Sequence, residues 1–223
     1  MDDLVDLELE SIEKILDKIK SDPEPDNIKQ IEIETWEKLY DSGKKGRRTG
    51  LGFTALADTL ASLGLKYDSK ESFEIIEKIM KTKCEGEFDS SIDMSIERGT
   101  FHGWDKNIEK QSGFNKMLEK ELPDLYTRMI NLGRRNVSIS TVAPTGTVSI
   151  MTQTSSGIEP VFMLFYKRRR KINPFENGSR VDFTDEMGDK WQEFDVFHPK
   201  LKMWMEKTEE KNIKKSPYYD CTA

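Results

Sequence analysis

Cysteine and histidine are scarce in this sequence, which contains two residues of each. Cys84 and Cys221 lie far apart and form no cluster of metal ligands, and His102 and His198 show no metal-binding spacing. The sequence therefore predicts no metal site. We expect a reduced, cytoplasmic protein.

A long apolar run and an excess of positive charge are also missing. No apolar stretch approaches the length of a membrane span, and the acidic start MDDLVDLELE is unlike a signal peptide. The net charge of −6 argues against general binding to nucleic acids or membrane surfaces. Hydrophobic residues make up only 35% of the 223 residues, so we expect a thin core that a partner helps to cover.

The first 132 residues carry mainly helical signals. Apolar residues recur with helical spacing, Gly64 is a predicted helix stop, and Pro123 interrupts the last segment. The predicted helices cover residues 2–19, 28–40, 53–63, 72–98 and 115–132.

The second part, residues 133–223, mixes strands, turns and a short helix. Alternation predicts a strand over Val137–Val142, and the run VFMLFYKRRRKI predicts another over Val161–Ile172. The segment VDFTDEMGDKWQEFDVF predicts a polar hairpin closed by EMGD, and HPKLKMWMEK predicts a short helix. Helices followed by mixed elements indicate the α/β or α+β class.

A stretch rich in small hydroxylated residues, STVAPTGTVSIMTQTSSGIEP, follows the first predicted strand. Pro144 ends the strand, and Gly146 lets the backbone approach a ligand closely. Free amides at the start of the next helix, with hydroxyls from Thr145, Thr147 or Ser149, could hold a phosphate. An ordinary helix cap without a ligand explains the same residues, and PTGT lacks the lysine of a P-loop.

Three other features invite a functional interpretation. The basic run Tyr166–Lys171 could meet phosphate, but a solvated strand end explains it better. Cys84 lies among lysines and glutamates without a second cysteine nearby, which favours an inert thiol, and Cys221 is undetermined. For His102 and His198 we expect structural roles in turns.

Two long motifs, GRRTGLGFTALADTLASLGLKYDS and RRNVSISTVAPTGTVSIMTQTSSGIEPVF, occur in this order. Together they resemble the barrel domain of the large catalytic subunit of ribonucleotide reductase, most similar to the adenosylcobalamin-dependent class. The resemblance covers essentially the whole chain. It implies an α/β fold that is a portion of a ten-stranded barrel, formed by residues 1–223 as one partial barrel domain with a helix-rich N-terminal half.

The resemblance also implies an activity: reduction of a ribonucleotide at its 2′ carbon through a cysteine thiyl radical, with adenosylcobalamin as cofactor. It places the substrate phosphates at Pro144, Thr145, Gly146, Thr147 and Ser149. Residues 157–160 and 47–52 would be structural. The implied partners are the ribonucleotide substrate and the remaining reductase segments, without a membrane and without direct nucleic-acid binding.

The sequence departs from this family where the radical chemistry takes place. The family carries its radical cysteine in an Asn-x-Cys-x-Glu loop, and Cys84 in KCEGE does not match it. We therefore assign no catalytic residue and expect an internal portion of the reductase that is inactive alone. The alternative hypotheses are a non-catalytic helical interaction module that retains reductase-like sequence and, more weakly, an unrelated phosphate-binding α/β protein.

Overall fold

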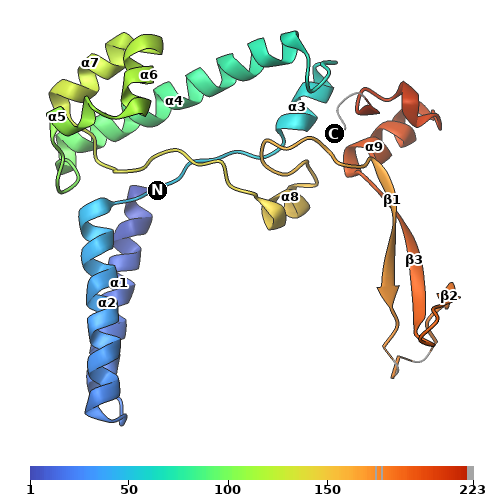
Figure 1. Cartoon of the computed structure of the whole chain (residues 1–223), viewed down its shortest axis with the longest axis horizontal. Helices are drawn as coiled ribbons and strands as arrows, with labels where there is room; N and C mark the ends of the chain where they lie inside the picture. Colours follow the sequence, from blue (N-terminus) through green and yellow to red (C-terminus); the bar gives the residue numbers. More distant parts are fainter. Residues whose placement is uncertain (174, 177, 220–223) are drawn as a thin grey trace. The chain divides into compact units, whose positions relative to one another are not determined.

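Two long amphipathic helices begin the chain in the computed structural model, which describes residues 1–173, 175–176 and 178–219. Helix α1 (Asp2–Ser21) and helix α2 (Asp26–Gly46) lie side by side (Figure 1). The apolar face of α1 is buried, and the Tyr40 hydroxyl donates a hydrogen bond of 2.8 Å to Glu13 of α1. Both predicted helices are confirmed, although α2 continues past the predicted end at Tyr40 to Gly46. Cys221 lies outside the described residues.

The chain divides into two compact units, of which the first comprises residues 1–52 and 76–141. Besides α1 and α2 it contains most of α4 (Lys70–Arg98), and α5 (Lys106–Glu109), α6 (Gly113–Glu121) and α7 (Pro123–Leu132). The break predicted at Pro123 is present, because proline occupies the first turn of α7 and α6 ends before it. The main apolar core of this unit consists of Phe88, Ile92, Leu118, Leu125, Tyr126, Met129 and Ile139.

The prediction of a regular strand over Val137–Val142 is wrong, because the segment forms only an isolated bridge. This segment pairs in parallel with residues 49–51 through a single isolated bridge between Leu51 and Ser140. The Leu51 amide donates to the Ile139 carbonyl at 2.8 Å, and the Thr141 amide donates to the Leu51 carbonyl at 3.1 Å. The alternating residues favour extended backbone, but only one extended neighbour among the described residues pairs with it, so no longer ladder forms.

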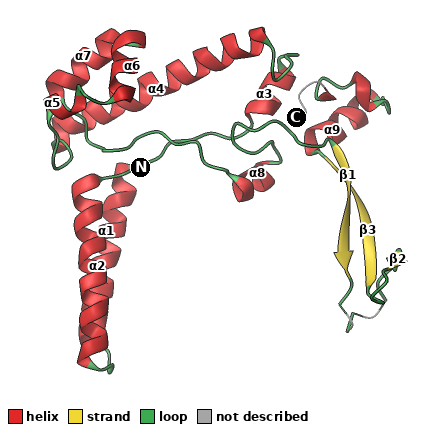
Figure 2. Cartoon of the chain, in the orientation of Figure 1, coloured by secondary structure: helices red, strands yellow, loops and turns green. Residues whose placement is uncertain are grey.

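The second unit comprises residues 53–75 and 142–219 of the described chain. Its helices are α3 (Leu56–Ser62), α8 (Gly146–Thr152) and α9 (Pro199–Thr208), with a short 3₁₀ turn η1 (Ile213–Lys215). Its strands are β1 (Phe165–Lys171), β2 (Phe183–Thr184) and β3 (Lys190–Phe197) (Figure 2). Gly64, with φ +71°, follows α3 as predicted, although this helix begins three residues after the predicted Phe53.

The three strands form one antiparallel sheet in the order β1-β3-β2. Phe165 lies opposite Phe197 and Lys171 lies opposite Trp191, so β1 pairs with β3 along its full length. The strand order makes β1 an edge strand of this sheet. A turn over Asp185–Asp189 joins β2 to β3, which confirms the hairpin predicted at EMGD. The described residues contain no parallel sheet beyond the single bridge, so the structure does not itself form the expected barrel.

Candidate functional site

The loop that precedes α8 has the geometry of an exposed helix start. Thr145 adopts the left-handed conformation with φ 45° and ψ 29°, and α8 begins at Gly146. Pro144, Gly146 and Thr147 are exposed, whereas Thr145 is half-buried and Ser149 is buried. The structure therefore brings the five residues predicted for the phosphate site together at one helix start, with three of them open to solvent.

The backbone amides of the first turn of α8 are available to a ligand. Ser149 donates its amide to the Thr145 carbonyl at 2.8 Å, which is the first hydrogen bond of the helix. The amides of Gly146, Thr147 and Val148 have no acceptor among the described residues, as the start of an α-helix requires. These three donors and the positive end of the helix can attract an anion.

The hydroxyl groups of the loop divide into two kinds. The Thr145 hydroxyl accepts a hydrogen bond of 2.7 Å from the Gly157 amide and lies 3.2 Å from the Thr54 hydroxyl. The Ser149 hydroxyl donates to the Gly146 carbonyl at 2.9 Å. Both are therefore engaged inside the protein, whereas the exposed Thr147 hydroxyl has no partner among the described residues. Of the three predicted hydroxyl ligands, Thr147 alone is free to meet a phosphate.

The loop after α8 locks this helix start in place. Gly157 has φ +49°, and a Cβ atom there would lie 3.0 Å from the Ala143 carbonyl oxygen, so glycine is required for the close approach. The Ser156 hydroxyl donates to the Pro144 carbonyl. The GIEP segment thus contacts the predicted phosphate loop directly, in agreement with the structural role that the sequence predicts for residues 157–160.

A buried pair, Asp58 and His198, lies behind this loop. The Nε2 atom of His198 is 3.5 Å from Oδ1 of Asp58, and both side chains are 8% exposed. Burial lowers the pKa of His198 below its usual range, although the Asp58 charge opposes this effect. The predicted turn role for His198 is wrong: the residue precedes α9, but its ring is enclosed by residues distant in sequence. No local sequence signal indicates this contact.

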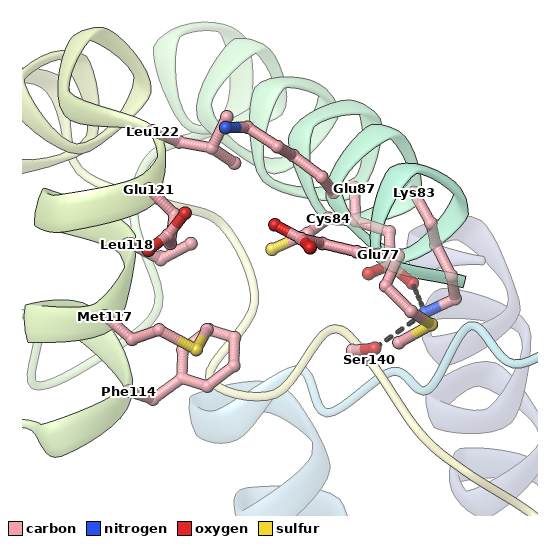
Figure 3. Close-up of a pocket in the computed structure, with 12 residues that line it drawn as sticks. Glu77, Lys83, Cys84, Glu87, Phe114, Met117, Leu118, Glu121, Leu122 and Ser140 are labelled. Carbon is pink, nitrogen blue, oxygen red and sulfur yellow. Dashed lines mark hydrogen bonds and ion pairs between the residues drawn. The ribbon is translucent and has the colours of Figure 1, made fainter. Parts of the chain in front are cut away.

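Cys84 lies in an apolar pocket of about 420 Å³ in the first unit, between α4 and α6 (Figure 3). Phe114, Met117 and Leu118 line the wall across from the thiol. Burial raises the pKa of Cys84, and the charge of Glu87 raises it further, so the thiol stays protonated at neutral pH. This environment supports the inert thiol that the sequence predicts.

The basic run on β1 is largely neutralised within the hairpin. All residues of β1 are exposed, as predicted for a solvated strand end. Glu193 of β3 lies 3.0 Å from Arg169 and 3.5 Å from Lys167, and Lys171 pairs with Asp189. The run is therefore an exposed, ion-paired strand rather than an anion site.

Comparisons with known proteins agree with the resemblance seen in the sequence. Residues 25–218 match the family described as ribonucleotide reductase, barrel domain. A vitamin B12-dependent ribonucleoside-diphosphate reductase of Thermoplasma acidophilum is 35% identical over 142 residues, which is 60% of this chain and 16% of that protein. A protein of the same name from Mycobacterium tuberculosis is 29% identical over 143 residues, which is 64% of this chain and 18% of that protein.

Among solved structures, the alpha subunit of the class Id ribonucleotide reductase of Actinobacillus ureae superposes with a TM-score of 0.43 and 19% identity. The match covers 61% of this chain and 23% of that one. The chain thus spans less than a fifth of the length of the curated relatives named above. Because the family match extends over most of its residues, the chain belongs to the ribonucleotide reductase barrel-domain family.

Proposed function

We propose that this chain is part of a ribonucleotide reductase and that it supplies the loop that binds the substrate phosphates. The loop consists of Pro144, Thr145, Gly146, Thr147 and Ser149. The observation that carries the proposal is the set of unpaired first-turn amides at Gly146, Thr147 and Val148, which follow the left-handed Thr145. The relatives are named ribonucleoside-diphosphate reductases, so a ribonucleoside diphosphate is the proposed substrate.

The parts of the loop have different roles in this proposal. The backbone amides and the Thr147 hydroxyl bind the phosphate, because they face solvent without an internal acceptor. Thr145 and Ser149 instead fix the backbone, since their hydroxyls are already bonded to Gly157 and Gly146. The segment from Asn136 to Phe165 contains no lysine or arginine, and Glu159 is its one charged residue. We therefore expect the chain alone to bind phosphate weakly.

The remaining chemistry belongs to groups outside this loop. Reduction at the 2′ carbon, in the family mechanism, needs a thiyl radical beside the ribose, and Cys84 is a protonated thiol in an apolar pocket of the first unit. The relatives named above are vitamin B12-dependent, and adenosylcobalamin would supply the radical in the complete enzyme. His198, a side chain of a type that ligates cobalt, is enclosed beside Asp58 and does not fit as a ligand for it. We expect no deoxynucleotide formation from this chain without further reductase segments.

Binding of pyrophosphate and of cytidine diphosphate to the ¹⁵N-labelled chain tests the proposal. Amide signals of residues 145–149 should shift in a saturable way in NMR spectra. Gly146→Asp should abolish the shifts, because the new carboxylate occupies the helix start and repels the anion. Gly113→Asp is the matched control: Gly113 also begins a helix, and a Cβ atom meets nothing within 4 Å at either glycine.

Two results would contradict the proposal. One is the absence of any shift in residues 145–149 at millimolar ligand while the rest of the spectrum shows a folded chain. The other is equal binding by Gly146→Asp and Gly113→Asp. Either result would favour the alternative of an interaction module that retains reductase-like sequence.

A further inference from the structure

The buried pair of Asp58 and His198 has no role in the function proposed above. The carboxylate comes from α3, and the imidazole comes from the residue that precedes α9. Asp58 Oδ1 and both ring nitrogens of His198 are fully enclosed, and no described residue completes a well-aligned hydrogen bond to them. Buried polar atoms without a hydrogen bond are rare in folded proteins, because each one costs free energy on folding. The pair therefore calls for a functional explanation.

Asp58 holds the loop after α8 at two points. Its Oδ2 atom accepts a hydrogen bond of 2.8 Å from the Ser155 amide, and its own amide donates to the Ser155 hydroxyl at 3.3 Å. The Ser155 carbonyl also accepts from the Thr54 hydroxyl at 2.7 Å and from the Ala55 amide at 3.1 Å. One carboxylate oxygen thus fixes the loop, while the other faces His198.

The loop passes this constraint on to the phosphate site. Two residues after Ser155, the Gly157 amide donates to the Thr145 hydroxyl at 2.7 Å and to the Thr54 hydroxyl at 3.2 Å. Thr145 is the left-handed residue from which α8 starts. A continuous path of hydrogen bonds and backbone therefore runs from Asp58 through residues 155–157 to the first turn of α8.

The backbone around His198 holds its ring against Asp58. The His198 amide donates to the Leu164 carbonyl at 2.8 Å, and the His198 carbonyl accepts from the Lys202 amide at 3.0 Å in the first turn of α9. The Tyr218 ring lies 5.8 Å from the imidazole between centroids. Besides Asp58 and Tyr218, Lys200 of α9 acts on the ring through its positive charge. The imidazole is therefore fixed, and Asp58 is its one acidic neighbour among the residues that the structure describes.

We propose that His198 is a positioning residue for the phosphate loop and acts by holding the Asp58 carboxylate in the orientation that binds the Ser155 amide. The neutral ring presents its Nε2–H to Oδ1, so that Oδ2 remains on the loop. Protonation places a full charge 3.5 Å from Oδ1, which redistributes the carboxylate between its two partners. The consequence for phosphate affinity rests on the proposed function, whereas the coupling between His198 and the loop does not.

The first experiment measures the coupling alone, without a ligand. The ring signals of His198 and the amide signals of Ser155 and Gly157 are followed by NMR between pH 5 and 8 in the full chain. We expect the amides to titrate with the midpoint of the His198 ring, below the usual histidine value. In His198→Gln the amides should not titrate over this range, and in His102→Gln, altered at an exposed histidine, they should behave as in the unaltered chain.

The second experiment measures pyrophosphate binding by the same variants at pH 7.5. His198→Phe removes the polar Nε2 group that lies 3.5 Å from Oδ1 and should weaken binding by about two- to tenfold, the size of a modest polar interaction. His198→Gln keeps a donor near the position of Nε2 and should bind nearly as well as the unaltered chain. If His198→Phe does not fold, the ligand-free titration of the unaltered chain and of His198→Gln still decides the matter.

The outcomes separate the two proposals. If Ser155 and Gly157 titrate with His198 but no variant binds pyrophosphate, the positioning role holds and the phosphate site fails. If the amide signals of Ser155 and Gly157 do not change as His198 is protonated, the positioning role is overturned, whatever the binding result. Equal pyrophosphate affinity for His198→Phe, His198→Gln and the unaltered chain would also overturn it.

Discussion

The carboxylate of Asp2 should be one of the most important single groups for the stability of the first unit. Its side chain is 1% exposed, and it meets the Arg47 Nε at 2.6 Å and the Asn136 Nδ2 at 3.0 Å. The side chains of Arg98 and Arg135 approach its other oxygen at 3.4 and 3.3 Å. Burial raises the pKa of Asp2, but Arg47 and Arg135 more than offset this, so the pKa lies below the usual range.

We predict that Asp2→Asn destabilises the first unit by about 3 kcal/mol, because it leaves the nearly buried Arg47 guanidinium without its charge partner. One amide hydrogen would also point at an arginine. If the free energy of unfolding falls by about 3 kcal/mol per molar of urea, the urea concentration at the unfolding midpoint should be lower by about 1 M. Far-UV circular dichroism at pH 7 measures this midpoint, since the unit is mainly helical.

Asp3→Asn is the matched control. Asp3 also pairs with an arginine, with Arg98 Nη1 at 2.5 Å, but its side chain is 77% exposed. Exposed ion pairs contribute less than about 1 kcal/mol, so the midpoint should hardly change. Equal midpoints for Asp2→Asn and Asp3→Asn would refute the reasoning from burial.

The pH dependence gives a second check on the same residue. Because the folded-state pKa of Asp2 is lowered, its contribution is complete above the unfolded value of about 3.9 and is lost as the pH falls through the folded value. The stability difference between the unaltered chain and Asp2→Asn should therefore shrink below pH 4. A difference that stays constant down to pH 2 would show that the charge of Asp2 is not its cause.

Two further predictions concern glycine and cysteine. Gly133→Ala should destabilise the folded chain by about 1–3 kcal/mol, because Gly133 has φ +82° and the new methyl group would collide with Thr100. Gly86→Ala, within α4 and with open space around it, should instead stabilise the chain by up to about 1 kcal/mol. Thermal unfolding compares the two variants, and equal effects would contradict the strain argument. In a Cys221→Ser background, Cys84 of the folded chain should react with iodoacetamide at pH 7.5 much more slowly than the thiol of free glutathione does, because burial raises the pKa of Cys84. In urea, which unfolds the chain, the two reaction rates should be equal. Rapid reaction of the folded chain would contradict the pocket environment.

The elements that could be predicted from the sequence are those set by local signals. Pro123 cannot continue the preceding helix, and Gly64 readily takes the left-handed backbone that ends α3. The turn at EMGD joins strands whose register follows from the turn itself. In each case a few adjacent residues contain the whole physical cause, so no knowledge of distant segments is needed.

The extended segment over Val137–Val142 shows where such reasoning stops. Its alternation of apolar and polar residues is typical of a strand, but a strand also needs neighbours that accept and donate its hydrogen bonds. Residues 49–51 provide one such neighbour through the bridge at Leu51 and Ser140. The pairing of residues so far apart in the sequence depends on the fold as a whole, which local alternation does not specify.

The hydroxyl-rich stretch from Ser140 to Pro160 has a structural cause that the sequence alone did not reveal. Thr54, Thr145 and Ser155 belong to irregular segments, where the backbone groups cannot find partners in a helix or sheet. Their hydroxyls bond to the Ser155 carbonyl, the Gly157 amide and the Asp58 amide, respectively. Buried backbone groups must be satisfied, so these side chains replace the missing ladder. If α8 binds an anion, the first-turn amides are the donors that this network leaves free, and the surrounding hydroxyls serve mainly to keep them in place.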